Sequence, residues 1–77
     1  MTLKELAGFF EEVVDLSGVE WREEAVLGED VPVDSRDMLR ILSRIEAQRH
    51  VRFPPPEILQ LRTVGDVARM AGRHARR

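Results

Sequence analysis

The chain has 77 residues, 43% of them hydrophobic and 34% charged, with a formal net charge of −2. This composition suits one small folded domain and excludes both an elaborate catalytic cleft and disorder along the whole length. Having no cysteine and two histidines, the chain offers no disulfide framework and no thiolate nucleophile, and no metal site is expected.

The first helix is predicted over residues 2–16. Thr2 followed by Glu5 has the spacing of a capping box. Apolar residues then recur at helical spacing, at Leu3, Leu6, Ala7, Phe10, Val13 and Val14. Ser17 and Gly18 are expected to end this helix.

A long loop is predicted from there to Asp34, because the segment has Gly28, Pro32 and scattered apolar residues without sustained periodicity. Loops of this length are uncommon in compact domains. We therefore expect Trp21 and Leu27 to pack onto the core and to anchor the loop there.

The second helix is predicted from Ser35 to about His50, and Asp34 and Asp37 have the spacing to cap it. Its broad apolar stripe consists of Met38, Leu39, Ile41, Leu42 and Ile45. Three consecutive prolines, 54–56, stop any further helix.

A short third helix is predicted over Glu57–Leu61, since Pro56 can occupy a first helical turn. The last helix is expected to begin after Thr63, with Asp66 completing a capping box, and to end at Gly72.

These elements predict an all-α fold. We expect a small four-helix bundle with a long loop between the first and second helices and a short third helix, built from residues 1–72. A flexible basic tail is expected at residues 73–77. No apolar run approaches the roughly 20 residues that span a bilayer, and no secretory leader is visible, so we expect a cytoplasmic protein without membrane insertion.

Charge is distributed unevenly along the chain. Residues 1–34 carry two basic and ten acidic side chains, whereas residues 35–77 carry ten arginines and four acidic side chains. This asymmetry fits either an internally complementary fold or a charged docking face. With a negative net charge and few aromatic residues, a nucleic-acid partner is not expected.

The segment Asp34-Ser35-Arg36-Asp37-Met38-Leu39 opens the second helix directly after the long loop. It resembles the phosphopantetheine attachment motif of acyl carrier proteins, usually written Asp-Ser-Leu. Three further segments follow in that family's register without a gap: Ile45-Glu46, Phe53-Pro54 and 61–67. The resemblance is specific over residues 34–70 and looser over residues 1–33.

The resemblance implies a carrier protein rather than an enzyme. A phosphopantetheinyl transferase would attach a 4'-phosphopantetheine arm from coenzyme A to Ser35, and acyl intermediates would be held on it as thioesters for fatty-acid, polyketide or other specialised synthesis. Partner enzymes that load, transfer or condense acyl groups would act on a carrier that is expected to be a monomer. A helix N-terminus suits a phosphodiester, because its dipole is positive there. Asp34 is expected to cap the helix and, by resemblance, to help the transferase orient coenzyme A or Mg²⁺.

Two further sets of residues are predicted to serve this role. The interior that could shelter an acyl chain is expected to be lined by Leu39, Leu42, Ile45, Phe53, Ile58, Leu61 and Val67. The surface that partner enzymes contact is expected to include Arg36, Asp37, Met38, Arg40, Ile41 and Arg44.

The second helix departs from the family in its charge. Family members generally present an acidic helix here, whereas this one carries four arginines, at positions 36, 40, 44 and 49, against two acidic residues. Arginines four apart disfavour the helix by a few tenths of a kcal/mol for each pair. They indicate a docking surface for an acidic partner, with a merely solvated face as the alternative.

Three functions remain open on the sequence alone. The first is an acyl carrier, the second a carrier for aminoacyl or peptidyl groups, and the third an unmodified helical adaptor in which Asp34 and Ser35 only cap a helix. Peptide-synthesis carriers usually have Gly-Gly-x-Ser before the arm, so the segment 32–35 favours the acyl class. Pro32 and Arg36 stand where the family usually has glycine and leucine, and the sequence alone leaves open whether a generic transferase modifies Ser35.

Overall fold

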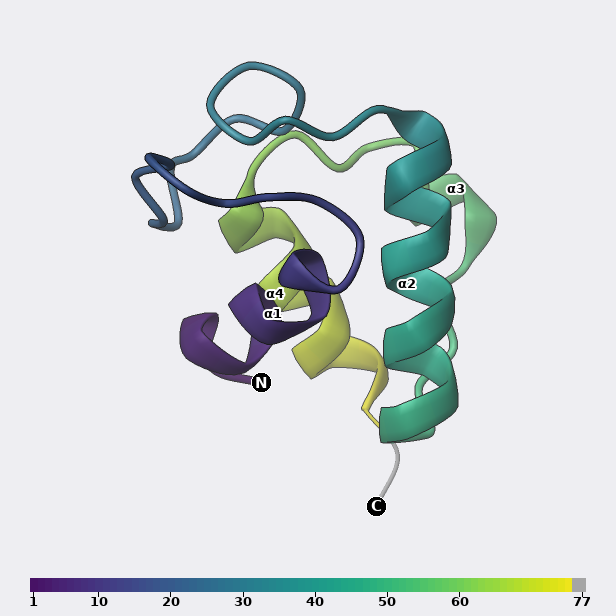
Figure 1. Cartoon of the computed structure of the whole chain (residues 1–77). Coiled ribbons are helices and arrows are strands. Elements are labelled where there is room, and N and C mark those ends of the chain that lie inside the picture. The colour runs from purple at the N-terminus through teal and green to yellow at the C-terminus, as the bar shows by residue number, and fades with distance from the viewer. Residues whose placement is uncertain (76–77) are drawn as a thin grey trace.

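A computed structural model describes residues 1–75 of the chain. Over these residues the chain forms four helices and, apart from isolated bridges, no β-structure. The helices are α1 (Leu3–Glu11), α2 (Ser35–Arg49), α3 (Pro55–Ile58) and α4 (Val64–His74). Helix α1 packs against both α2 and α4, with the long loop arching over one end of the bundle (Figure 1). The predicted all-α bundle with a short third helix is confirmed.

Each of the three longer helices opens with a capping box. The side chain of the N-cap residue accepts a hydrogen bond from the backbone N–H three residues later, and the side chain of that later residue accepts one from the N-cap N–H. The three pairs are Thr2 with Glu5, Asp34 with Asp37, and Thr63 with Asp66. All three predicted helix starts are confirmed.

Helix α1 ends earlier than predicted. It stops at Glu11 instead of residue 16, and the backbone N–H groups of Val13 and Val14 both bond to the carbonyl of Phe10 in a closing turn. The carboxylate of Asp15 then accepts the N–H of Ser17 at 2.8 Å, which offers the backbone a turn in place of another helical bond. The apolar spacing of the two valines reflects packing against the core, where both are partly buried.

The core is formed by one cluster of fifteen buried hydrophobic residues, and no polar or charged residue of the described chain is buried. The helices contribute Leu6, Phe9, Phe10, Ile41, Leu42, Ile45, Val64, Val67, Met70 and Ala71. The connecting segments contribute Ala25, Val31, Val33, Val51 and Phe53. Within residues 1–75, no helix has the length and apolar character needed to cross a membrane.

The long loop is held against the bundle at two places. The indole N–H of Trp21 donates to the carbonyl of Leu3 at 2.8 Å, and its ring meets Phe10 edge to face with 5.0 Å between centroids. The start of α4 is joined to the loop by backbone bonds, among them that from Gly65 N–H to the Glu23 carbonyl at 2.9 Å. The predicted packing of Trp21 is confirmed, and these contacts keep the loop leading into α2 in place.

Helix α4 continues past Gly72 to His74, so the predicted helix end is wrong. Arg73 donates to one oxygen of Glu57 at 2.8 Å, and the Nε2 of His74 lies 2.7 Å from the other oxygen. These contacts join the last turn of α4 to α3 and order two residues of the predicted tail. Residues 76 and 77 lie outside the described part of the chain.

Candidate functional site

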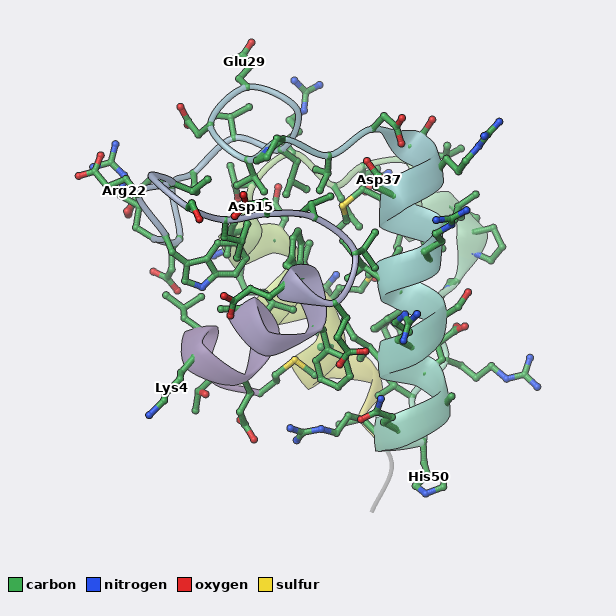
Figure 2. All side chains as sticks on the ribbon, in the orientation of Figure 1. Lys4, Asp15, Arg22, Glu29, Asp37 and His50 are labelled. Carbon is green, nitrogen blue, oxygen red and sulfur yellow. The ribbon has the colours of Figure 1, made fainter. Side chains whose placement is uncertain are left out.

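Ser35 is the first residue of α2 and is exposed. Figure 2 labels Asp37 at this end of the helix and His50 at the opposite end. The hydroxyl therefore stands at the positive end of the helix dipole, open to an approaching enzyme. Burial of this serine inside the bundle would have excluded its modification.

Asp34 fixes the backbone on which Ser35 stands. Its Oδ1 accepts the N–H of Asp37 at 2.8 Å, while Oδ2 of Asp37 accepts the N–H of Asp34 at 3.1 Å. The bond from the Asp37 N–H is the main reason why the pKa of Asp34 is lowered from its ordinary value, an effect that partial desolvation opposes. Asp34 is thus a carboxylate at neutral pH, and its predicted capping role is confirmed.

An apolar groove of about 380 Å³ begins beside Ser35. It lies where the end of the loop, the first turns of α2 and the α3 region meet. Its lining consists of Leu27, Val33, Asp34, Ser35, Met38, Leu39, Ile58, Leu59 and Leu61. A hydroxyl at the mouth of such a groove fits the attachment of a long arm, because the arm or an apolar group on it can lie along the groove.

Three of the seven residues predicted to line an acyl cavity do line this groove, namely Leu39, Ile58 and Leu61. The other four, Leu42, Ile45, Phe53 and Val67, are buried in the core and are not part of its lining. The prediction that Leu39 lies in the interior is wrong, because this side chain is 56% exposed. Helix α3, which supplies Ile58 to the same groove, has four residues, and none of them is buried.

Of the residues predicted for partner docking, some are exposed and others are not. Arg36 and Arg40 are exposed, and Asp37 and Met38 are partly exposed. The prediction for Ile41 is wrong, because its side chain is completely buried in the core. Met38 lines the groove beside Ser35 instead of standing on the outer face of the helix.

The arginines of α2 fall into two pairs. Arg44 donates to Glu12 at 2.9 Å and Arg49 donates to Glu5 at 2.8 Å, so the second half of α2 is bound to α1 by charge. The pKa of Glu5 falls from 4.5 to about 2, first because its carboxylate accepts the Thr2 N–H and then because Arg49 donates to it. Part of the charge asymmetry between the two halves of the chain is therefore internally complementary.

Three residues of the groove, Leu27, Val33 and Leu59, were not predicted from sequence as site residues, although Leu27 was expected to pack onto the core. Val33 and Leu59 both line it, and Leu59 is 87% exposed. An apolar residue directly after a helix opened by prolines was the available signal for Leu59. The sequence has no signal for Val33, because a single valine before a helix cap can equally well be a core residue.

Among residues 1–75, no group of three or more histidine, cysteine, aspartate and glutamate side chains is arranged to hold a metal ion. The groove and the exposed serine at the start of α2 lie next to each other. They point to a protein that carries a covalently attached group.

Comparison with known families agrees with this geometry. Residues 4–71 match the family described as the phosphopantetheine attachment site, and the chain belongs to that family. No curated protein and no solved structure shows significant similarity to it. The chain is therefore a phosphopantetheine-carrying carrier protein, with the 4'-phosphopantetheine arm as its covalent cofactor. Carrier domains of this family are generally non-catalytic and interact with phosphopantetheinyl transferases and with enzymes that handle the carried groups.

Proposed function

We propose that the arm is attached to Ser35 and that the protein is an acyl carrier. The observation that carries the proposal is an exposed serine at the first position of a capped helix, at the mouth of an apolar groove. When bound, the arm supplies the thiol on which acyl groups are held as thioesters. Partner enzymes load and remove those groups.

The attachment reaction needs only a free hydroxyl from this chain. The oxygen of Ser35 attacks the phosphorus atom of coenzyme A that bears the pantetheine. The bond from that phosphorus to the bridging oxygen breaks, adenosine 3',5'-bisphosphate leaves, and the serine proton passes to a base of the transferase. Asp34 holds the helix start during the reaction and presents a carboxylate beside the serine, suited to a transferase-bound Mg²⁺.

The lining of the groove supports an acyl cargo over an aminoacyl one. Apart from Asp34 and Ser35 every side chain in the lining is apolar, including Leu27, Val33 and Met38. An alkyl chain gains from leaving water in such a groove, by roughly 0.8 kcal/mol for each fully buried methylene group. The charged amine of an aminoacyl group would lose hydration along the apolar part of the groove, where the one carboxylate of the lining is that of Asp34, beside Ser35.

The test is modification in vitro. The protein is incubated with coenzyme A and a panel of phosphopantetheinyl transferases, and its intact mass is measured. We expect the wild type to gain the mass of one arm and Ser35→Ala to gain nothing. Ser43→Ala is the matched control, because Ser43 is also an exposed serine of α2 and should leave modification intact.

Absence of modification with every transferase would contradict the proposal and favour an unmodified adaptor. An arm on Ser35→Ala would place the attachment elsewhere. If the arm forms, the cargo is then tested by loading octanoyl and alanyl groups onto it. Greater protection of the octanoyl thioester from hydrolysis in the wild type than in Leu61→Asn is expected, and equal hydrolysis would contradict an acyl-sheltering groove.

A further inference from the structure

The two arginines of α2 that lie nearest to Ser35 form no salt bridge within residues 1–75. Arg44 and Arg49 are bound to α1, whereas Arg36 and Arg40 are exposed and unpaired in this part of the chain. The helix explains the difference, because each step of four residues turns about 40° around its axis. Arg44 lies about 40° further around the helix than Arg40 and about 80° further than Arg36, and it is the one of these three whose guanidinium reaches a carboxylate, that of Glu12, within residues 1–75.

The acidic residues of α2 do not serve these arginines. Asp37 is engaged by the N–H of Asp34, and Glu46 accepts the N–H of Phe53 at 2.9 Å. Of the effects that lower the pKa of Asp34, the charge of Arg36 is the smallest, and it comes after a hydrogen bond from the Arg36 backbone. Both carboxylates of the helix are therefore used to hold its own backbone and that of the following segment.

Helix stability gives no reason for two cations here. Arg36 lies in the first turn, where the helix dipole disfavours positive charge. Arg36 and Arg40 are four residues apart, which disfavours the helix by a few tenths of a kcal/mol. Two unpaired guanidinium groups that oppose local stability require another explanation.

Apolar side chains lie next to these cations. Leu39 lines the groove beside Ser35 and also a shallow hollow on the outer side of α2, together with Arg36, Arg40, Ser43 and Arg44. Leu39 and Leu59 are the two exposed large hydrophobic residues among the described residues, and both line the groove. An exposed apolar centre flanked by charge is the composition of a protein-binding surface.

We infer that Arg36, Leu39, Arg40 and Leu59 form a docking surface, here named the basic face, for enzymes whose carrier-binding surface is acidic around an apolar contact. The inference rests on the proposed attachment at Ser35, since the basic face adjoins that serine. Acidic partners would be drawn to it and oriented with their active site over the arm, while partners with a basic surface would be repelled.

The transferase reaction provides the test, because it requires an enzyme to approach Ser35. Two phosphopantetheinyl transferases are used, one with an acidic and one with a basic surface around its coenzyme A site. With the acidic transferase, reversing both charges (Arg36→Glu with Arg40→Glu) should lower kcat/KM at low salt by about tenfold or more. With the basic transferase the same variant should be modified faster than the wild type.

The matched control is Arg22→Glu with Arg52→Glu, which changes the net charge equally at exposed positions away from Ser35. Arg22 projects from the long loop (Figure 2). Arg52 follows α2 in the chain, at the end of the helix opposite to Ser35. This control should stay within about twofold of the wild type. Replacing both Arg36 and Arg40 with lysine should preserve the rate with the acidic transferase, and its dependence on salt.

Failure of the docking surface and failure of the attachment site give different results. If Ser35 is modified but the rates do not respond to the charges of Arg36 and Arg40, or respond equally in the control, the basic face is refuted and the attachment stands. If no transferase modifies Ser35 in any variant, both proposals fall. Stronger salt-sensitive binding of a DNA duplex than of the acidic transferase at the basic face would refute a protein partner.

Discussion

Asp34 caps α2 and also holds the backbone beside Ser35. Its replacement by two different residues tests how much it contributes to stability and how much to modification of Ser35. Asp34→Ala removes the acceptor of the Asp37 N–H, a bond of 2.8 Å at an exposed helix start. Loss of such a cap lowers the free energy of unfolding by about 1 kcal/mol. The lost interaction between the carboxylate and the helix dipole is part of this loss. In a domain of this size a loss of about 1 kcal/mol lowers Tm by about 4–8 °C.

Asp34→Asn is the informative companion, because asparagine caps helices as well as aspartate does but has no charge. We expect it to lose only the dipole contribution, so that unfolding in urea ranks wild type, Asn and Ala in falling stability. The pKa of Asp34 is lowered in the folded protein, so the advantage of the wild type over Asp34→Asn is present above pH 3.8 and is lost as the pH falls below it. If the carboxylate also serves the transferase, Asp34→Asn will be modified slowly although it is folded.

Thr63→Ala removes the equivalent cap of α4 and should destabilise by a similar amount without slowing modification. Equal stability of Asp34→Ala and the wild type would contradict the capping role of Asp34. Equal losses with asparagine and alanine would contradict the contribution of its side-chain hydrogen bond.

Three further predictions concern other parts of the molecule. Gly72→Ala should stabilise α4 by about 0.5–1 kcal/mol because its added Cβ meets open space. Gly65→Ala should gain at least about 1 kcal/mol less, since its Cβ would lie 3.1 Å from the Glu23 carbonyl oxygen. Equal gains of the two variants in urea unfolding would contradict this contact. The stability contributed by Glu5 is present above pH 4.5 and is lost as the pH falls toward its folded pKa of about 2. Glu5→Gln should therefore flatten the pH dependence of the free energy of unfolding between these two values. An unchanged slope would show that Glu5 does not cause that pH dependence. Leu59→Ser should change the free energy of unfolding by less than about 0.5 kcal/mol because the side chain is 87% exposed. It should nevertheless slow modification by an acidic transferase. A marked loss of Tm would show instead that Leu59 packs in the core.

The parts of the fold that could be predicted from sequence depend on local spacing. Each capping box places two polar residues three positions apart, and that spacing is visible without any tertiary information. The attachment motif is local in the same sense, since Asp34 and Ser35 are adjacent. The end of α1 could not be predicted, because Val13 and Val14 continue a helical apolar pattern although the chain has already turned.

The features of the site that could not be predicted depend on which elements lie opposite one another in the fold. Leu39 belongs to an apolar stripe, but its side chain is 56% exposed and borders a groove that Ile58 and Leu59 line from the α3 region. The pairing of Arg44 with Glu12 joins residues far apart in the chain, as does that of His74 with Glu57. No spacing in the sequence specifies such contacts. The salt bridges to Glu12 and Glu5 are what distinguish Arg44 and Arg49 from the arginines of the basic face.

The most direct test of the account is to locate the arm by tryptic mapping of the modified protein. Cleavage after lysine and arginine places the chain's three serines, 17, 35 and 43, in separate peptides, covering residues 5–22, 23–36 and 41–44. We predict that the 23–36 peptide alone gains the mass of phosphopantetheine. The added mass on the peptide of Ser17 or Ser43, or on none of the three, would contradict the account.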